Sequence, residues 1–330
     1  MISYDYKGRA WVVGYTYPYI RDVILKSTLP YLTYLLIFNY RITEGGILVG
    51  TDEDIEVIQT AKQFDTPSTL VLTSYSSIGD IELKVEYGVL FDVQLQDRII
   101  DQLLSILSIK GYSGVNLAFQ FINTTNQQLY LNFLIKVSER MHLEGYSVFL
   151  TINPGLSNTE GEISFEQINY SPFSDESDGI LFLSYDWASI DRSPMQDAAV
   201  ITGSFLEYII TQVPLDKIRI GLPTLGYDWQ LPYVEGRTRA RALNFESVMA
   251  LAREVNAVIY YDENSLTAYF EYTDIDINQH IVRFKDARSI DSILKLIQGY
   301  GIYGVGIWNI MNDFAQMWLV INTQYEIINV

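Results

Sequence analysis

The chain has 330 residues, of which 48% are hydrophobic, and it carries a formal net charge of −18. This is enough apolar sequence for a large buried core, and the length suits one α/β barrel with an insertion. The strong negative charge argues against nucleic acid and anionic membranes as partners, because both bind basic patches. The absence of cysteine excludes disulfides and thiolate chemistry.

The sequence also indicates no cofactor, metal site or membrane insertion. His142 and His280 lie far apart in the sequence, so we expect no metal site. No run of 18 apolar residues is present, and the first residues lack a charged segment followed by an apolar one. We therefore expect neither a membrane span nor a secretory signal in this chain. The sequence is also compatible with a fragment of a longer protein.

Strand-like and helix-like segments alternate along the chain, which is typical of βα units. The sequence predicts eight barrel strands at Trp11–Tyr17, Leu32–Asn39, Thr69–Ser74, Gly114–Phe121, Ser147–Asn153, Gly179–Asp186, Lys217–Pro223 and Gly304–Asn309. Most are followed by a helical pattern, which is clearest at Gln96–Lys110 and Asn126–Leu143. We therefore predict an α/β fold, a closed (β/α)8 TIM barrel of parallel strands.

The alternation breaks once, between Gly226 and Arg288. This stretch contains a short helical pattern at Phe245–Val255, followed by alternating runs at Ala257–Asp262, Ala268–Tyr272 and His280–Phe284. A helix with antiparallel strands makes a small α+β insertion after the seventh strand, at the rim where active-site walls are built. We expect the barrel to span 1–226 and 289–330 and the insertion to span 227–288.

The fourth predicted strand lies within GYSGVNLAFQFIN, residues Gly111–Asn123. Alternate side chains of a strand point to opposite faces. One face carries the bulky apolar Val115, Leu117, Phe119 and Phe121, and the other carries Gly114, Asn116, Ala118 and Gln120. This arrangement suits a strand whose outer face packs on helices and whose inner face points toward a ligand. The inner face can form hydrogen bonds but has no ionisable group, which argues against catalysis at this strand.

Ordered sequence runs extend over most of the chain. They include GYTYP at Gly14–Pro18, KGYSGVN at Lys110–Asn116, SYDW at Ser184–Trp187, GLPTLGYDWQLPY at Gly221–Tyr233 and GIWNIM at Gly306–Met311. Together they resemble glycoside hydrolase family 18, the chitinase-like family, and within it the catalytic domains of bacterial spore-cortex-lytic N-acetylglucosaminidases. The resemblance implies a (β/α)8 barrel with an α+β insertion after the seventh strand, in agreement with the pattern above.

In that family the fourth strand ends in a DGxxxDxE-like motif. Its final Glu protonates the glycosidic oxygen, and the Asp two residues earlier orients the acetamido group whose carbonyl attacks the anomeric carbon. Here the Glu position is Gln120, the Asp position is Ala118 and the first Asp is Ser113. A glutamine amide has no transferable proton near the operating pH, so it cannot act as a general acid. The resemblance therefore implies that the family's chemistry is absent or very slow.

The binding half of the family's site is better preserved. By resemblance, Tyr185 bonds the acetamido carbonyl, Asp186 contacts a sugar hydroxyl and Trp308 forms the floor of the central subsite. An indole offers flat apolar area to a pyranose ring together with one N–H donor. Asn116 and Gln120 on the fourth strand are further candidates for sugar contact. Weaker candidates at the rim are Tyr15, Tyr17, Tyr227, Asp228 and Trp229.

These observations predict a catalytically disabled barrel that binds a glycan or serves as a structural component. By resemblance, the partner is a polymer that contains N-acetylglucosamine, as in peptidoglycan, cortex or chitin, and the location is the cell envelope or the spore surface. Envelope or spore-coat proteins are candidate partners. Two alternatives stay open: an active glycosidase that uses another acid, for which Asp186 is the nearest candidate, and a protein-interaction scaffold.

Overall fold

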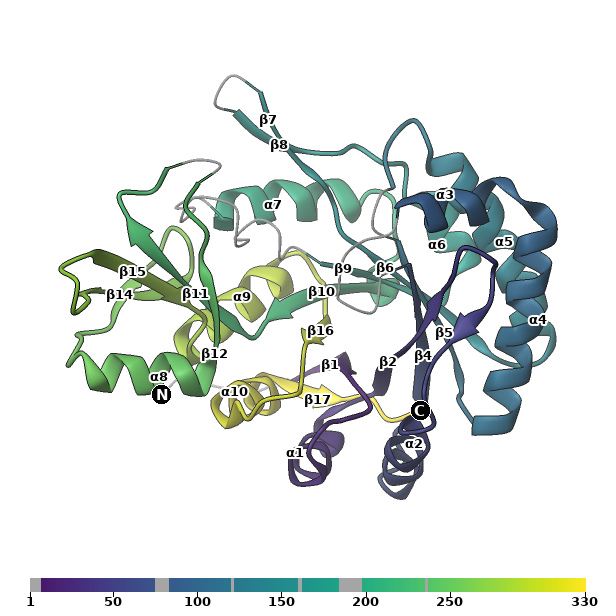
Figure 1. Ribbon diagram of the computed structural model, residues 1–330, viewed down its shortest axis with the longest axis horizontal. Helices are drawn as coiled ribbons and strands as arrows, with labels where there is room; N and C mark the ends of the chain where they lie inside the picture. The colour runs from purple at the N-terminus through teal and green to yellow at the C-terminus, as the bar shows by residue number, and fades with distance from the viewer. Residues whose placement is uncertain (1–6, 75–82, 120–121, 160–161, 184–197, 235–236) are drawn as a thin grey trace.

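The computed structural model describes the chain except for residues 1–6, 75–82, 120–121, 160–161, 184–197 and 235–236. Figure 1 shows a barrel with helices around it and a smaller sheet to one side. The predicted α/β class is thus confirmed. Within the described part of the chain, no helix is both long and apolar enough to cross a bilayer.

Eight parallel strands form the barrel. Each pairs in parallel with two neighbours, and the pairing of the first strand with the second closes the ring. Their bounds are β1 Gly8–Thr16, β2 Tyr34–Ile42, β4 Ser68–Thr73, β5 Gly114–Phe119, β6 Ser147–Ile152, β9 Gly179–Phe182, β10 Ile218–Pro223 and β16 Gly304–Trp308. Each predicted barrel strand overlaps one of these, so the predicted (β/α)8 TIM barrel is confirmed.

Two barrel strands are longer than predicted because short strands pair with their ends. β1 begins at Gly8, where it pairs with the C-terminal strand β17 (Tyr325–Ile327). β2 continues to Ile42, where it pairs with the short antiparallel strand β3 (Leu48–Val49). These pairings join segments whose contact is not visible in the local sequence pattern.

Helices cover the outside of the barrel. Their bounds are α1 Asp22–Thr28, α2 Asp54–Gln63, α3 Leu83–Phe91, α4 Val93–Lys110, α5 Gln127–Leu143, α6 Ser171–Glu176, α7 Ala198–Ile209, α9 Ala287–Gly299 and α10 Ala315–Gln324. α4 begins before the predicted Gln96 because the side chain of Asp92 accepts hydrogen bonds from the backbone N–H groups of Gln94 and Leu95. It ends at Gly111, whose φ of 79° is left-handed and suits glycine.

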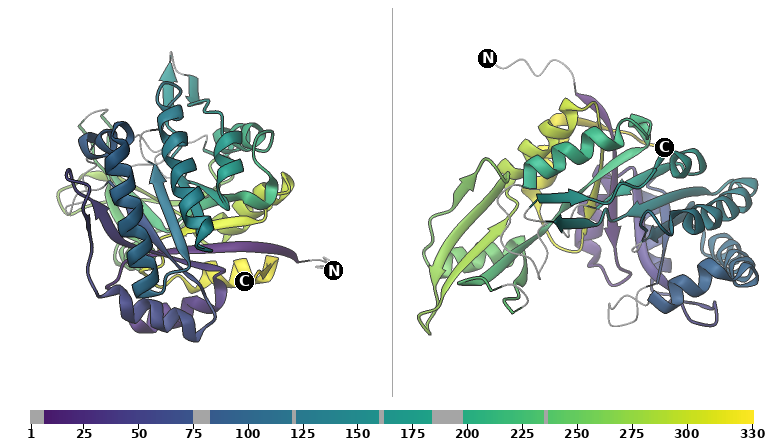
Figure 2. Two further views of the ribbon diagram at one scale, coloured as in Figure 1. Left: turned by 90° about the vertical axis from the view of Figure 1, so that its right-hand side faces the viewer. Right: turned by 90° about the horizontal axis from the view of Figure 1, so that it is seen from above.

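The insertion after β10 is a five-stranded antiparallel sheet, in the order β12-β11-β15-β14-β13, with one helix. Its elements are β11 Leu225–Leu231, β12 Arg241–Asn244, α8 Phe245–Glu254, β13 Tyr260–Asp262, β14 Thr267–Thr273 and β15 Gln279–Phe284. Figure 2 shows that it projects from one side of the barrel. The predicted helix and three strands are present, whereas β11 and β12 were not predicted. The division into units at 227 and 288 stays a prediction.

A further hairpin was also missed by the sequence analysis. β7 (Leu156–Thr159) and β8 (Glu162–Phe165) pair antiparallel after β6. In Figure 1 the hairpin extends away from the barrel.

The wall of barrel strands separates two apolar cores. The larger one lies between the strands and the helices and includes Val115 and Leu117 of β5. The smaller one fills the barrel lumen and contains Val13, Tyr15, Leu36, Val71, Ala118, Leu181 and Leu183. Since the carboxyl ends of all the barrel strands meet at one face, side chains late in each strand surround one opening.

Candidate functional site

The carboxyl end of β5 follows the predicted alternation. Val115 and Leu117 pack in the outer core, whereas Ala118 belongs to the lumen cluster. Asn116 shares the inner face with Ala118 and is 1% exposed. Gln120 lies outside the described residues, so its predicted sugar contact stays a prediction. For the described part of the strand, the outward and inward faces are those expected from the sequence.

Ala118 presents a methyl group to an apolar lumen. Its neighbours in the cluster include Val13, Tyr15 and Leu183, and the partly buried Trp308 packs against the same cluster. Among the described residues of this cluster, none carries a carboxylate or an ammonium group. The position that the resemblance assigns to an orienting acid is therefore occupied by a small apolar side chain.

A string of three hydrogen-bonded polar side chains, Tyr15, Thr151 and Asn116, crosses the lumen beside Ala118. The hydroxyl of Thr151 on β6 donates to Oδ1 of Asn116 over 2.9 Å. Thr151 also shares a short hydrogen bond with the Tyr15 hydroxyl. Because the single proton of Thr151 is directed to Asn116, the Tyr15 O–H must be the donor of the second bond.

Burial determines the ionisation of this string. Burial raises the pKa of Tyr15 by more than its contacts with Thr151 and Asn116 lower it, so the phenol stays neutral. Nδ2 of Asn116 is buried, and Asn116 also lies beside the Tyr15 hydroxyl, whose pKa it lowers. Tyr15, Thr151 and Asn116 therefore form one compact polar group in the lumen.

Aromatic rings connect the lumen to the surface at the carboxyl end of β1. Trp308 lies 5.0 Å from the ring of Tyr15 and 5.0 Å from that of Phe38, measured between centroids. Phe38 in turn lies 5.6 Å from Tyr17, which stacks on Tyr19 at 5.4 Å. Exposure rises along this path, from 1% at Tyr15 to 70% at Tyr19. The path offers aromatic faces to a ligand that enters from solvent.

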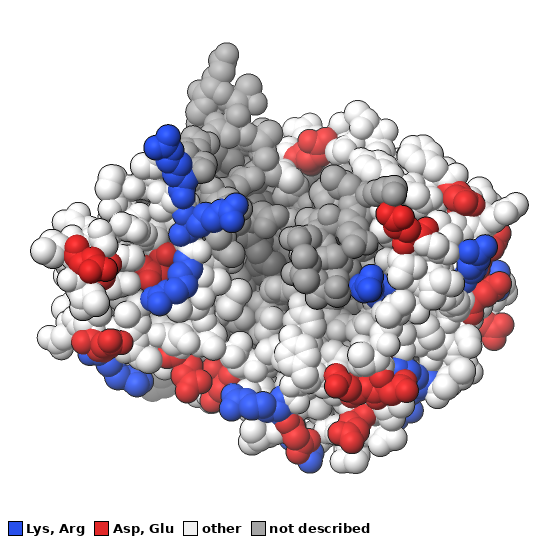
Figure 3. Space-filling view, in the orientation of Figure 1, with Lys and Arg blue, Asp and Glu red and all other residues white. Residues whose placement is uncertain are grey.

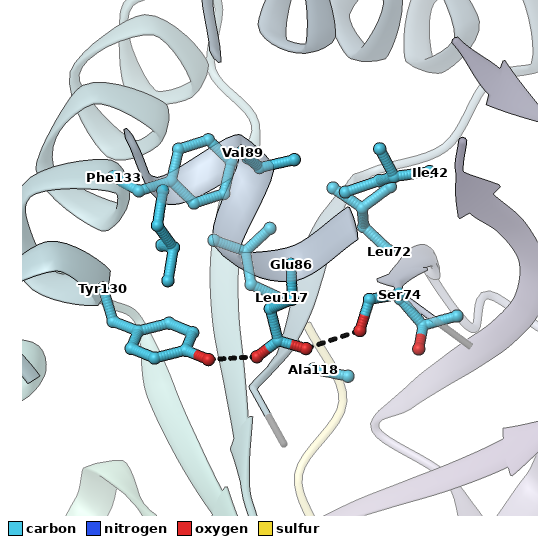
Figure 4. Close-up of a pocket in the computed structure, with 11 residues that line it drawn as sticks. Ile42, Leu72, Ser74, Glu86, Val89, Leu117, Ala118, Tyr130 and Phe133 are labelled. Atoms are coloured by element: carbon cyan, nitrogen blue, oxygen red, sulfur yellow. Dashed lines mark hydrogen bonds between the residues drawn. The ribbon is translucent and has the colours of Figure 1, made fainter. Parts of the chain in front are cut away.

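A buried carboxylate lies beside the same strand end. Glu86 of α3 accepts a hydrogen bond of 2.5 Å from Ser74, which directly follows β4, and a second, shorter one from Tyr130 of α5. Figure 4 shows the carboxylate between these two hydroxyls, with Ala118 at the edge of the cavity that Glu86 also lines. The cavity measures about 30 Å³, close to the volume of one water molecule. Glu86 was not singled out from the sequence.

The two neighbours Asp228 and Trp229 on β11 point to opposite faces of the insertion sheet. Asp228 is buried and bonds Arg241, Tyr272 and His280, each over 2.9 Å. These contacts give it a structural role inside the insertion, and its predicted place at the sugar-binding rim stays a prediction. Trp229 is 1% exposed, and its predicted contact with a sugar stays a prediction.

The remaining predicted site residues, Tyr185 and Asp186, lie outside the described residues, as does Gln120. Figure 3 shows one face of the molecule, with described acidic and basic side chains scattered over it. The structure thus brings together Tyr15, Asn116, Ala118 and Trp308 in one lumen.

Two residues of interest were missed by the sequence analysis, for different reasons. Tyr19 continues the alternation of Tyr15 and Tyr17 past Pro18, so a signal was present in the GYTYP run and its next residue. Glu86 had no local signal, because its burial depends on where Ser74 and Tyr130 lie in space.

Comparison with known families places this arrangement in context. A family model described as Glycosyl hydrolases family 18 matches residues 12–313. The chain is 27% identical over 303 residues to the cortical fragment-lytic enzyme of Bacillus subtilis (strain 168), which covers 91% of this chain and 69% of that protein. It is 29% identical over 299 residues to the enzyme of the same name from Bacillus anthracis, covering 90% and 69%.

Solved structures are similar over nearly the whole chain. The crystal structure of the Bacillus cereus spore cortex-lytic enzyme SleL has a TM-score of 0.87 at 27% identity and covers 98% of this chain and 76% of that one. A chitinase from Chromobacterium violaceum has a TM-score of 0.81 at 19% identity, covering 96% and 98%, and shares the fold.

Proposed function

Because this chain belongs to glycosyl hydrolase family 18, we propose that it binds a glycan containing N-acetylglucosamine without hydrolysing it. The observation that carries the proposal is Ala118, whose methyl group lies in an apolar lumen cluster at the position of an orienting acid. A methyl group can neither hold an acetamide nor stabilise the positive charge that develops on it. Losing one such preorganised group costs about 3 kcal/mol of transition-state stabilisation.

The residue two positions later supports the same conclusion. Gln120 stands where the family motif has its proton donor, and an amide cannot donate a proton to a glycosidic oxygen. Loss of a general acid typically lowers the rate by about 10² to 10⁴. The two losses need not add, because groups that act as a unit are not additive.

The binding half of the proposal is supported by the aromatic path. Trp308 and Tyr15 lie at its inner end, and Tyr17 and Tyr19 at its outer end. Aromatic faces stack on the apolar faces of pyranose rings, and this contact needs no charge. The relatives named as cortex-lytic and cortical fragment-lytic enzymes favour a peptidoglycan-like polymer as the ligand, with chitin as the other candidate.

Calorimetry and a hydrolysis assay on the same chito-oligosaccharides test the proposal. We expect the wild-type protein to bind the tetramer of N-acetylglucosamine and to release no shorter products. Trp308→Phe should weaken binding, whereas Trp318→Phe should not, because Trp318 stacks on Tyr31 in the outer core. Cleavage by the wild-type protein would contradict the proposal, and so would a complete lack of binding, which would favour a scaffold.

The double substitution Ala118→Asp with Gln120→Glu tests whether the rest of the site is intact. We expect it to acquire slow hydrolysis of the tetramer, since it restores an orienting acid and a proton donor. Each single variant should stay inactive. The gain in rate measures how well the remaining residues still position the sugar.

One observation favours an active enzyme as the second candidate. Glu86 is a buried carboxylate that shares a cavity with Ala118. If the wild-type protein cleaves the tetramer, Glu86→Gln should abolish cleavage. If that variant keeps full activity, Glu86 is not the acid. Both of its oxygens already accept hydrogen bonds, from Ser74 and Tyr130, which fits a structural role better.

A further inference from the structure

We propose that the insertion docks an extended, basic segment of a partner protein, which adds a strand to the open edge of β14. The site is a groove of about 960 Å³, which we call the insertion groove. One wall is the end of α8 with the segment after it, residues 254–258, and the other wall is residues 271–275. This volume is at the upper end of the range for ligand sites.

The insertion groove lies at the end of the insertion sheet that is far from the barrel. β11 follows β10 almost directly and runs outward to Leu231, which pairs with Gln279, the first residue of β15. Gln279 pairs in turn with Thr273, which lines the groove. Figure 2 shows that the insertion projects from the barrel. The groove is therefore separate from the lumen, and its role does not depend on the proposed function.

β14 has an open edge beside the groove. The short strand β13 is at the edge of the sheet and pairs with β14 only from Thr267 to Tyr269. From Phe270 to Thr273, β14 pairs with β15 on one side, and no described strand pairs with it on the other. An open edge presents backbone N–H and C=O groups, and an extended peptide satisfies them by adding a strand. The groove gives such a peptide space beside this part of β14.

The charges of the groove favour a basic partner. Glu254 lies on one wall and Glu271 on the other, and both side chains are exposed. Neither forms an ion pair with any described residue. Arg241 also lines the groove, but its guanidinium is bonded to the buried Asp228 over 2.9 Å. Lysine or arginine side chains of a bound segment would therefore find a carboxylate on each wall.

Exposed apolar side chains line the same groove. Val258, Tyr260 and Ile275 are 65%, 55% and 98% exposed. The ring of Tyr260 lies 5.7 Å from that of Tyr269, at the point where β13 ceases to cover β14. Exposed apolar groups gathered beside an open strand edge are typical of an interaction surface. A segment in which basic and apolar residues alternate would satisfy both the carboxylates and these side chains.

Two other occupants match the groove less well. A neutral glycan would leave Glu254 and Glu271 without a cation, and it lacks the regular backbone N–H and C=O groups with which a strand edge pairs. A second copy of this chain carries the same net charge of −18 and would be repelled. The open edge and the two carboxylates together favour a basic polypeptide.

Calorimetric titration with three synthetic peptides tests the proposal. The first alternates lysine and valine over about eight residues, a length of about 27 Å when extended. The second has glutamate in place of lysine. The third keeps the lysines but carries N-methyl groups along its backbone, which removes its N–H donors. We expect the first peptide to bind and the other two to bind at least about tenfold more weakly.

The double substitution Glu254→Gln with Glu271→Gln tests the two walls. Its matched control is Glu246→Gln with Glu263→Gln, which changes the net charge equally at exposed positions of the insertion outside the groove. The groove variant should bind the lysine–valine peptide about fivefold more weakly than the wild type, and the control should lose less than about twofold. Equal losses would show that the peptide responds only to the overall charge, and the proposal would be wrong.

Hydrogen exchange measured by mass spectrometry locates the bound peptide. The lysine–valine peptide should slow exchange of the backbone N–H groups of residues 270–273, but not of β12, the strand at the other edge of the sheet. Protection of β12 instead, or no binding of this peptide, would overturn the proposal. Loss of binding to the N-acetylglucosamine tetramer in the groove variant would assign the groove to the glycan. If the wild-type protein binds no tetramer, the proposed function fails, but the peptide measurements still decide this proposal.

Discussion

At the scale of single residues, Arg219 is an unusual component of the barrel. It is 3% exposed, and its guanidinium lies 5.0 Å from the ring of Trp11 and 5.8 Å from that of Phe149. Among the described residues, no carboxylate lies within ion-pair distance of it. Burial lowers its pKa to about 10, which still leaves it charged at neutral pH. The two rings, and a hydrogen bond to the carbonyl of Lys217, offset part of the cost of burying this charge.

Gly179 makes room for this guanidinium, and we predict that Gly179→Ala destabilises the protein. A Cβ at position 179 would lie 2.0 Å from Nη1 of Arg219. Arg219 is confined by Trp11 and Phe149, so we expect a loss of about 1 to 3 kcal/mol in the free energy of unfolding. Urea unfolding followed by circular dichroism measures it.

Gly299→Ala is the matched control for this substitution. Gly299 is the last residue of α9, and a Cβ there would meet no atom within 4 Å. This variant should be as stable as the wild type or slightly more stable, because alanine favours helix. Equal unfolding midpoints for the two variants would show that Arg219 moves aside at little cost.

At the scale of elements, the turn between β13 and β14 depends on Asp262. Its carboxylate accepts hydrogen bonds from the backbone N–H of Asn264, from the hydroxyl of Ser265 and from Arg283. Partial burial raises the pKa of Asp262, but the hydrogen bonds from Ser265 and Arg283 outweigh it, and the pKa lies below its usual value. The ionised form of Asp262 is therefore more stable, relative to the protonated form, in the folded state than in the unfolded chain.

This shift predicts a pH-dependent contribution to stability. The contribution is present above the unfolded pKa of about 4 and is lost as the pH falls through the lower folded pKa. Asp262→Asn should cost about 1 kcal/mol at pH 7, and the difference from the wild type should shrink between about pH 4 and pH 2. Urea unfolding at a series of pH values checks it.

Glu263→Gln serves as the control, because Glu263 is the exposed neighbour of Asp262 in the same turn. Glu263→Gln removes one negative charge, as Asp262→Asn does, but it leaves the hydrogen bonds of Asp262 in place. A constant difference between Asp262→Asn and the wild type at every pH would contradict the assigned role.

The barrel strands were predictable because their runs of apolar residues are local. β4, for example, is buried at every position, as expected for a parallel strand covered on both faces. β11 was missed although Tyr227, Asp228 and Trp229 alternate, because a single residue, Thr224, separates it from β10. A strand that follows another so closely looks like its continuation or like a loop.

The site was predictable only in part, for a related reason. The inward face of β5 followed from alternation alone. The contact of Asn116 with Thr151 did not, because it depends on the register between β5 and β6, in which Asn116 lies opposite Phe149. Register between barrel strands is set by packing of the whole ring, which no single segment encodes.

At the scale of the whole molecule, the net charge of −18 contrasts with the uncharged lumen cluster. We predict that binding of a neutral chito-oligosaccharide is nearly independent of salt, with less than about a twofold change between about 50 and 500 mM NaCl. Calorimetry at several ionic strengths measures it. A sulfated polysaccharide such as heparin should be repelled at low salt. A steep salt dependence for the neutral tetramer would indicate that charged groups contact it.

The pairing of β17 with β1 has a practical consequence. Tyr325 lies beside Gly8, at the start of β1, so the C-terminal strand joins the barrel at the end opposite the opening. A fluorescent reporter or a surface tether attached after Val330 would leave from that far side. If the protein were immobilised in this way on a sensor chip, the opening of the barrel would face the flowing solution.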